Sequence, residues 1–482
     1  MNDKLRIYQP GAILTLVFII TAIRIAALYI STTDLFFDEA QYWTWSKALS
    51  FGYFSKPPMV AWLISATTEI CSGDSPFCVR LSAPLLHGLT ALLVYYTARD
   101  LYDRRTGFWS AITYLTLPGV TLSSFFISTD APLMFFWALA FRCFVKAPES
   151  DSDKWWLLTG LAVGLGMLSK YTLAVFFIAA AMYLLLHKPH RKLRPFIHLT
   201  IAGMLAALIF FPNLYWNAMH HFVSFQHTNE NVLGNMDRFQ IRKLLEFLVG
   251  QLFVFGPILL IALGTMAASI PRYLKEQQGA MLIPFTFVLL IIAIIISFSS
   301  GAQAHWAAPA YIAGSILTVR FLLLSKQTHL LRLSLGIHIA VMCLFLFATS
   351  PYLGEITSRS PFARLQTWNM LATPAAQALT EHPGSVLVSD ERKAVATLMY
   401  RFHTKEGMPY PVMKWNPGGK IHDHYDLMNT INLYRDRDFV FITRAAEITA
   451  ITPYFVSVEK IREVNAAGKI FTLYSLHGFK GY

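Results

Sequence analysis

Five charged or titratable side chains stand at separate turns of a mainly apolar chain: Asp38, Lys56, Asp130, Lys170 and His305. Glu39 follows Asp38, which places two carboxylates among aromatic residues just after the first long apolar run. A carboxylate can take a proton from an acceptor hydroxyl group as that group attacks. A lysine can neutralise a phosphate whose charge builds as it leaves. Together these residue types predict group transfer from a lipid-linked phosphate donor.

Aromatic side chains accompany these charges. Tyr42 and Tyr53 lie in the same segment as the acidic pair, and Trp306 follows His305 directly. Aromatic faces suit sugar rings and lipid chains. We therefore expect Tyr42, Tyr53 and Trp306 to contact a substrate.

Taken one at a time, the charged residues have structural explanations. Asp38-Glu39 could be a solvated helix start at a membrane surface, and Asp130 before a proline suits a helix N-cap. Lys170 could extend its ammonium group to the interface, and His305 could belong to an interfacial aromatic belt. Lys56-Pro57-Pro58 could be a plain turn. If all of these residues lie on the same side of the membrane, a single cavity that they line together explains them better than these separate roles.

The composition indicates a polytopic membrane protein. Of 482 residues, 55% are hydrophobic and 14% are charged, whereas a soluble domain carries roughly 25% charged residues. A helix needs about 20 apolar residues to cross a bilayer. Eleven runs are candidates, near 11–30, 81–98, 108–127, 131–146, 156–169, 171–187, 196–212, 246–269, 281–298, 307–324 and 333–350.

Basic clusters between the runs predict the orientation. They occur at Lys4/Arg6, Arg99/Arg104/Arg105, Lys146–Lys154, Lys188/Arg191/Lys192/Arg194, Arg272/Lys275 and Lys326/Arg332. With eleven spans all of them fall on one side, which the positive-inside rule places in the cytoplasm. The five charged or titratable positions then lie together at the outer face. Since these loops account for the net charge of +12 and no compact basic domain is visible, we do not expect nucleic-acid binding.

The chain divides into a membrane part and a tail. We expect a transmembrane domain over 1–350, interrupted by external loops at 31–80 and 213–245, and a soluble α/β domain over 351–482. In the tail, 385–389, 438–443 and 469–475 are rich in strand formers, and Glu391–Arg401 is typical of a helix. The aromatic first loop predicts short interfacial helices.

The cysteines say little about function, and several well-known catalytic and nucleotide-binding motifs are absent from the sequence. Cys71 and Cys78 share the first loop, where a disulfide and two free thiols are both open. The sequence has no phosphate-binding loop, dinucleotide-binding glycine pattern, serine-hydrolase elbow or HExxH motif. We expect no nucleotide and no cofactor, and leave a divalent cation open.

Five motifs resemble those of a known family. They are Asp38-Glu39-Ala40-Gln41-Tyr42-Trp43, Gly52-Tyr53-Phe54-Ser55-Lys56-Pro57-Pro58, Ser128-Thr129-Asp130-Ala131-Pro132, Gly166-Met167-Leu168-Ser169-Lys170-Tyr171 and His305-Trp306-Ala307-Ala308-Pro309. Their order over residues 10–350 resembles bacterial members of the protein O-mannosyltransferase-like group. That group belongs to the polyprenol-dependent glycosyltransferases of the GT-C fold, and it includes aminoarabinose and galacturonic acid transferases of lipid A and lipopolysaccharide core.

The resemblance implies an inverting transfer of one sugar from a polyprenyl-phosphate sugar to a periplasmic acceptor, with lipid A or core as the expected partner. It implies a location in the bacterial inner membrane. Asp38 would activate the acceptor with support from Glu39, and Asp130 would orient acceptor or sugar. Lys56 and Lys170 would contact the donor phosphate, with His305 nearby.

One departure and two alternatives remain. Relatives often have an acid where Ser55 precedes Lys56, and its absence weighs against an aminoarabinose donor and against a metal held there. A transporter or flippase would spread its polar residues through the membrane rather than collect them at one face. A protein O-glycosyltransferase would use the same donor with another acceptor, and a non-catalytic scaffold is a weaker alternative.

Overall fold

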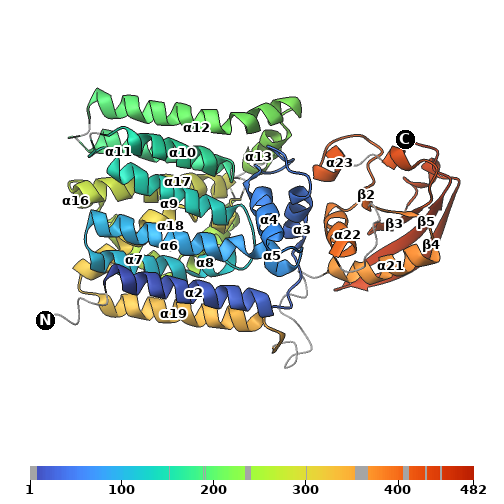
Figure 1. The fold of residues 1–482 in the computed structure, drawn as a ribbon, viewed down its shortest axis with the longest axis horizontal. Helices are drawn as coiled ribbons and strands as arrows, with labels where there is room; N and C mark the ends of the chain where they lie inside the picture. The colour runs from blue at the N-terminus through green and yellow to red at the C-terminus, as the bar shows by residue number, and fades with distance from the viewer. Residues whose placement is uncertain are drawn as a thin grey trace. The chain divides into compact units, whose positions relative to one another are not determined.

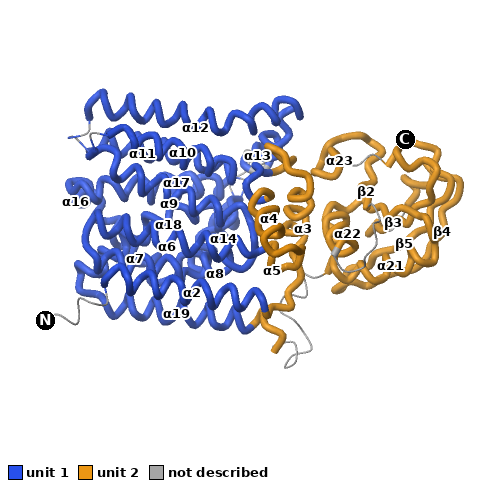
Figure 2. The backbone as a smooth tube through the Cα atoms, in the orientation of Figure 1, with its two compact units in different colours: residues 1–29, 56–60, 80–347 blue, residues 30–55, 61–79, 348–482 orange. Residues whose placement is uncertain are grey.

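The computed structural model describes residues 8–150, 152–187, 189, 191–233, 240–299, 301–352, 367–404, 412–428, 431–445 and 448–482. Part of the expected second loop (234–239) and parts of the tail lie outside these residues. The chain forms two compact units, shown in blue and orange in Figure 2. The first unit comprises 1–29, 56–60 and 80–347, and the second comprises 30–55, 61–79 and 348–482. The second unit thus combines most of the first loop with the tail.

The first unit is built of helices (Figure 1). They are α2 (Pro10–Ile30), α6 (Ser82–Leu101), α7 (Arg104–Thr116), α8 (Pro118–Ser123), α9 (Asp130–Lys146), α10 (Lys154–Met167), η1 (Tyr171–Ala174), α11 (Val175–Leu186), α12 (Leu193–Met219), α13 (Val223–Leu233), α14 (Ile241–Val254), α15 (Pro257–Ala267), α16 (Ile270–Tyr273), α17 (Gln277–Ser299), η3 (Ala304–Ala307), α18 (Ala310–Leu324) and α19 (Thr328–Ala348). Each of the eleven expected apolar runs falls on one or more of these helices. The all-helical architecture predicted for this part is confirmed.

Two of the runs are interrupted. The run near 108–127 breaks between α7 and α8, where Leu117 is extended (φ −48°, ψ 136°) before Pro118, because a residue before proline avoids helical geometry. The run near 246–269 is bent by 113° between α14 and α15. Gly256 has φ +92° there and precedes Pro257, so this run forms two helices instead of one.

Within the described residues, five helices are long and apolar enough to cross a membrane, and a sixth span results if the bent pair counts as one. The five are Pro10–Ile30, Pro76–Leu101, Leu193–Met219, Gln277–Ser299 and Thr328–Ala348. The other runs fall on shorter helices, so the count of eleven spans stays a prediction.

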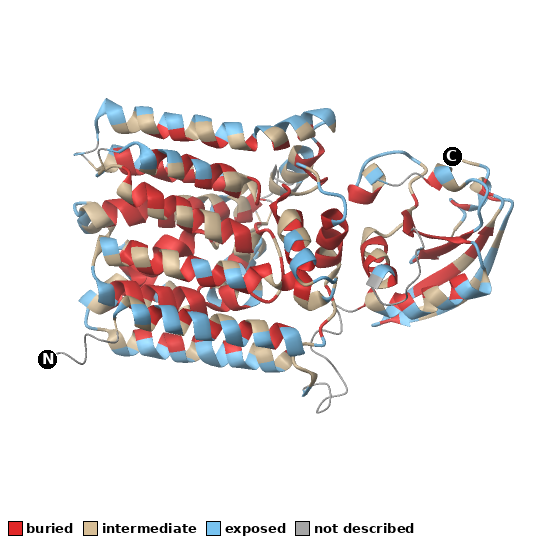
Figure 3. Cartoon of the chain, in the orientation of Figure 1, coloured by how far each residue is buried: buried red, intermediate tan, exposed pale blue. Residues whose placement is uncertain are grey.

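Exposed apolar side chains cover the outer helices of the first unit. On α12, Met204 and Leu208 are exposed, as are Phe18 on α2 and Leu344 on α19, whereas most residues of α6, α9 and α17 are buried or half-buried (Figure 3). Such a surface suits lipid contact.

Small residues bring α10 and α12 close together. A Cβ atom at Gly160 would lie 2.5 Å from the carbonyl oxygen of Ala202, and one at Gly164 would lie 3.0 Å from Cα of Ala206. Both pairs follow a small-xxx-small spacing, which lets two helix backbones approach within a bilayer.

The loop part of the second unit forms three short helices: α3 (Phe37–Ser46), α4 (Met59–Ile70) and α5 (Pro76–Arg80). Short helices were predicted here, and their position at the membrane surface stays a prediction. Helix α4 begins in the first unit, since the boundary lies between Val60 and Ala61. Cys71 and Cys78 carry free thiols. Burial, followed by a hydrogen bond with Cys78, raises the pKa of Cys71 to about 11.

The tail part of the second unit is an α/β fold. Its strands are β1 (Val386–Ser389), β2 (Val412–Lys414), β3 (Phe439–Thr443), β4 (Ser457–Ala466) and β5 (Lys469–His477), in the sheet order β2-β1-β3-β5-β4. The pairs β1·β2 and β1·β3 are parallel, and the pairs of β5 are antiparallel. Its described helices are α21 (Ala372–Glu381), α22 (Arg392–Thr404) and α23 (His424–Met428), with short 3-10 turns η4 (Asn369–Leu371), η5 (Ile431–Tyr434) and η6 (Thr452–Tyr454). The three predicted strands and the predicted helix at 391–401 are confirmed.

Candidate active site

An ion pair forms the centre of the candidate site in the first unit. Lys170 Nζ donates a hydrogen bond to Asp130 Oδ1 at 2.8 Å, and the two side chains are only 14% and 15% exposed. Asp130 begins α9, but its carboxylate makes no cap, and the N-cap position belongs to Thr129. The capping interpretation of Asp130 is therefore wrong, because Lys170 takes the carboxylate.

Local backbone geometry positions Lys170. It lies in the turn between α10 and η1, where its N–H donates to the carbonyl of Gly166 at 3.1 Å. A Cβ atom at Gly166 would lie 2.7 Å from Cβ of Phe136 on α9. The missing side chain therefore lets this turn lie against the helix that carries Asp130.

The segment that carries Lys56 is held to the same turn. The N–H of Met59 donates to the carbonyl of Leu168 at 2.9 Å. Pro57 and Pro58 stiffen the stretch between Lys56 and this hydrogen bond. The charge of Lys56 acts on both Asp130 and His305, so three of the predicted residues, Lys56, Lys170 and His305, lie around Asp130.

His305 completes the cluster. Its Nε2 lies 3.6 Å from Asp130 Oδ2. It lies in η3, which Gln251 of α14 anchors by donating to the carbonyl of Ala304 at 3.2 Å. Tyr311 in turn donates to Gln251 Oε1 at 2.8 Å. Side chains of α14 and α18 thus support the segment that presents His305.

The imidazole of His305 is held neutral. Burial lowers its pKa to about 4, and the positive charges of Lys170 and Lys56 act in the same direction against the carboxylate of Asp130. The side chain is 44% exposed, yet protein surrounds the ring closely enough for lost hydration to dominate. At neutral pH His305 therefore offers one donor and one acceptor, without a charge.

A cavity opens beside this cluster. Its lining includes Asp130 and His305, together with His87, Ser123 and Tyr311. His87 is buried on α6, with Nδ1 2.8 Å from the hydroxyl of Tyr114 and Nε2 3.0 Å from Ser123 Oγ. Sequence reasoning missed His87, although a histidine inside the apolar run 81–98 was a visible signal.

The acidic pair of the first loop lies in the second unit, and its two carboxylates differ. Glu39 is buried, and its Oε2 accepts a hydrogen bond from the N–H of Phe36 at 2.9 Å, which is the second half of a capping box at the start of α3. Asp38 is half-exposed and pairs with Arg392 of α22, with Oδ1 3.2 Å from Nη1. Only Asp38 therefore presents a carboxylate outward, and a solvated helix start does not describe Glu39.

The three aromatic residues expected at the substrate are largely used for packing. Tyr53 is stacked on Trp45 at 4.6 Å, and its hydroxyl donates to backbone carbonyls. Burial raises the pKa of Tyr53 to about 12. Tyr42 is buried and lies 5.2 Å from Trp45, and Trp306 packs against the core of the first unit. Their contact with a substrate stays a prediction.

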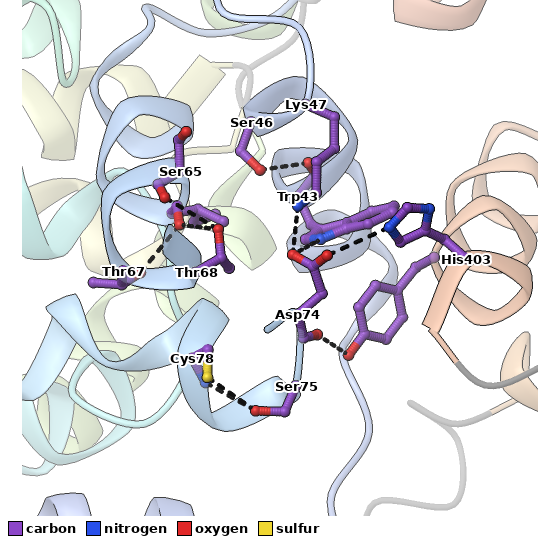
Figure 4. Close-up of polar contacts among 12 residues, drawn as sticks. Trp43, Ser46, Lys47, Ser65, Thr67, Thr68, Asp74, Ser75, Cys78 and His403 are labelled. Carbon is purple, nitrogen blue, oxygen red and sulfur yellow. Dashed lines mark hydrogen bonds and ion pairs between the residues drawn. The ribbon is translucent and has the colours of Figure 1, made fainter. Parts of the chain in front are cut away.

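Asp74 joins the loop and tail parts of the second unit (Figure 4). Its carboxylate accepts hydrogen bonds from Trp43 and Lys47, and His403 Nε2 lies 3.4 Å from Oδ2. Burial acts to raise the pKa of Asp74, but the hydrogen bonds from Lys47 and Trp43 lower it below its usual range. Tyr400 also donates to the backbone carbonyl of Asp74 at 2.9 Å.

Among the residues that the structure describes, no group of three or more His, Cys, Asp or Glu side chains is placed to hold a metal ion.

The comparison with known proteins identifies the family. A model of dolichyl-phosphate-mannose-protein mannosyltransferases matches residues 55–216. Lipid A galacturonosyltransferase RgtD of Rhizobium johnstonii is 33% identical over 476 residues, which cover 97% of this chain and 98% of that protein. The chain belongs to the protein O-mannosyltransferase-like family of polyprenyl-phosphate-sugar-dependent glycosyltransferases.

Two further proteins are similar to this chain, one in sequence and one in structure. The undecaprenyl phosphate-alpha-4-amino-4-deoxy-L-arabinose arabinosyl transferase of Erwinia tasmaniensis is 32% identical, but over only 35% of this chain and 32% of its own length. The crystal structure of ArnT from Cupriavidus metallidurans bound to undecaprenyl phosphate has a TM-score of 0.66 and 13% identity, covering 96% of this chain and 98% of that chain. The expected GT-C fold of this multi-pass membrane glycosyltransferase is confirmed.

Proposed function

We propose that this glycosyltransferase transfers one galacturonic acid residue from a polyprenyl-phosphate donor to lipid A, with inversion at the anomeric carbon. The observation that carries the proposal is the likeness to a lipid A galacturonosyltransferase over nearly the whole length of both chains. The aminoarabinose transferases match over about a third of the chain. Ser55, where that branch has an acid, supports the same choice of sugar.

The proposed orientation puts the site outside the cytoplasm. Eleven spans would place the N-terminus inside, and the loops 31–80 and 213–245 and the domain 351–482 in the periplasm. The basic clusters on one side of the helical runs support this arrangement. The protein would then lie in the inner membrane, where a lipid-linked donor supplies the energy without a nucleotide.

In the proposed reaction, an acceptor oxygen forms a bond to the anomeric carbon while the bond from that carbon to the phosphate oxygen breaks. The ammonium groups of Lys56 and Lys170 neutralise the polyprenyl phosphate as its negative charge grows. Asp130 holds Lys170 in place, since the two share a 2.8 Å hydrogen bond. Neutral His305 donates a hydrogen bond to the polyprenyl-phosphate sugar without adding a positive charge to the site.

Asp38 takes the proton that the acceptor hydroxyl group loses. It is the half-exposed carboxylate of the acidic motif, whereas Glu39 serves the helix start. If the acceptor group is an ionised phosphate, no proton has to be removed, and Asp38 positions the group instead.

The test uses purified full-length protein with a polyprenyl-phosphate galacturonic acid donor and lipid A. Mass spectrometry is expected to show lipid A heavier by one uronic acid residue, and Asp38→Asn is expected to abolish this product. Donor consumption without a glycosylated lipid would contradict the proposed acceptor. Unchanged transfer by Asp38→Asn would contradict the role of that residue.

A further inference from the structure

Two cations from the tail flank the acidic motif of the first loop within the second unit. Arg392 and Lys393 are the first two residues of α22. Nη1 and Nη2 of Arg392 lie 3.2 and 3.3 Å from Oδ1 of Asp38, and Nη1 also donates to Oε1 of Gln41. The guanidinium group lies 5.4 Å from the centre of the Phe37 ring, and Lys393 Nζ lies 4.4 Å from the same point.

This cluster carries an excess of positive charge. Its two cations face one carboxylate, Asp38, because Glu39 is turned to the backbone of Phe36. The acids that precede α22 are also engaged: Glu391 pairs with Arg444 at 3.4 Å, and Asp390 accepts from Thr443 at 2.8 Å. In the part of the chain that the structure describes, no ion pair engages Lys393.

Cohesion between loop and tail does not explain the pair of Arg392 and Asp38. The two side chains are 30% and 40% exposed, and an ion pair this open to solvent contributes little to stability. The second unit has better-buried connections. Arg401 pairs with Asp34 at 3.1 Å, and the rings of Trp43 and Tyr400 lie 5.1 Å apart.

We propose that Arg392 and Lys393 bind an anionic oxygen group of the substrate, a phosphate or a carboxylate, next to Asp38. A guanidinium group can hold such a group by two parallel hydrogen bonds, and an ammonium group adds charge without fixed geometry. When the anion occupies Arg392, it displaces Asp38 from the guanidinium, and the freed carboxylate turns to the acceptor hydroxyl group. Binding of the anion thereby makes the carboxylate of Asp38 available as a base. This inference rests on the proposed transferase function.

Two sources of the anion are compatible with this chemistry: a phosphate of lipid A, or the carboxylate of the uronic acid on the donor. The experiment measures transfer kinetics of the full-length protein with four substrate pairs. Lipid A with and without its phosphates is combined with donors that carry galacturonic acid or galactose. The variants are Arg392→Gln and Lys393→Gln, with Arg392→Lys to retain the charge.

The second unit offers matched control residues. Arg462 donates to Gln377 and pairs with Glu381, as Arg392 does with Gln41 and Asp38. Lys469 lies 5.6 Å from the ring of Trp368, as Lys393 lies over Phe37. Arg462→Gln and Lys469→Gln should leave transfer unchanged, and thermal unfolding of all variants shows whether each of them is folded.

Each test variant is expected to raise KM about tenfold for the substrate that carries the anion, since the variant loses a charged hydrogen-bond donor to that anion, while kcat changes less. Arg392→Lys should restore part of the loss. If the effect disappears with dephosphorylated lipid A, the anion is the phosphate, and if it disappears with the galactose donor, the anion is the carboxylate. An equal KM increase with all four pairs, or none in folded variants, overturns the proposal. Absence of transfer by the wild type with every pair would instead contradict the proposed function.

Discussion

Lys170 and Asp130 form a short, poorly exposed ion pair between two turns that lie 40 residues apart in the sequence. The pair links the end of α10 to the start of α9, and His305 lies 3.6 Å from the second carboxylate oxygen. A carboxylate that is paired in this way cannot also act as a freely available base. Its position instead fixes the ammonium group that we propose for the donor phosphate.

Removing one member of this pair should cost both stability and activity. In Lys170→Met or Asp130→Asn, one charge remains without its partner, and the free energy of unfolding should fall by about 3 kcal/mol. The double variant Lys170→Met/Asp130→Asn should regain most of that stability, but its kcat should stay at least about 100-fold low, because the charge that stabilises the leaving phosphate is gone. Thermal unfolding in detergent and single-turnover transfer measure the two effects. Recovery of activity in the double variant would show that the pair has only a structural role.

Neutral His305 predicts a specific pH dependence. Because its pKa is lowered to about 4 in the folded protein, while an unfolded histidine titrates near pH 6.5, stability is fully present above pH 6.5. It falls as the pH drops from about 6.5 toward 4, since only the unfolded state then gains the proton. His305→Gln stays neutral at every pH and should remove this part of the acid sensitivity. Thermal unfolding between pH 8 and pH 4.5 checks the prediction, and equal acid sensitivity of wild type and variant would contradict it.

The sequence alone was sufficient to predict those site residues that are unusual in their surroundings. Lys170 and Asp130 are charged groups at the ends of apolar helices, so their types and positions alone indicated a site. Arg392 was invisible in this way, because it is an ordinary cation in a soluble helix and its partner Asp38 lies 354 residues away. Only tertiary structure brings such a pair together.

The roles of Glu39 and the edges of the sheet show two further limits. Glu39 looks like Asp38 in the sequence, and only the direction of its side chain toward the N–H of Phe36 distinguishes the two. Strand β4 has one buried residue, Ala466, and carries charges at Glu459, Lys460 and Arg462, so it lacks the apolar pattern of a strand. Strand β2 has only three residues, and its length gives no periodicity to detect.

The contact between α10 and α12 predicts which glycines tolerate a methyl group. In Gly160→Ala the new Cβ would lie 2.5 Å from the carbonyl oxygen of Ala202, so the helices must separate, at a cost of about 1–3 kcal/mol. Gly336 on α19 has no neighbouring atom within 4 Å of the same position, and Gly336→Ala should be neutral or stabilise the helix by about 0.5–1 kcal/mol. Thermal unfolding of the two variants provides a matched comparison, in which equal midpoints would contradict close packing at Gly160.

Substitutions of the two neighbouring carboxylates of the first loop should affect different properties, transfer activity for Asp38 and stability for Glu39. Asp38→Asn should lose transfer while its thermal midpoint stays close to that of the wild type, since the Asp38–Arg392 pair is half-exposed. Glu39→Ala should lose about 1 kcal/mol of stability, because the N–H of Phe36 is left without its acceptor. Glu39→Gln should retain that stability and most of the activity, since glutamine also serves at this position of a capping box. If Glu39→Gln is folded and as inactive as Asp38→Asn, Glu39 takes part in the chemistry, and its assignment to the helix start is incomplete.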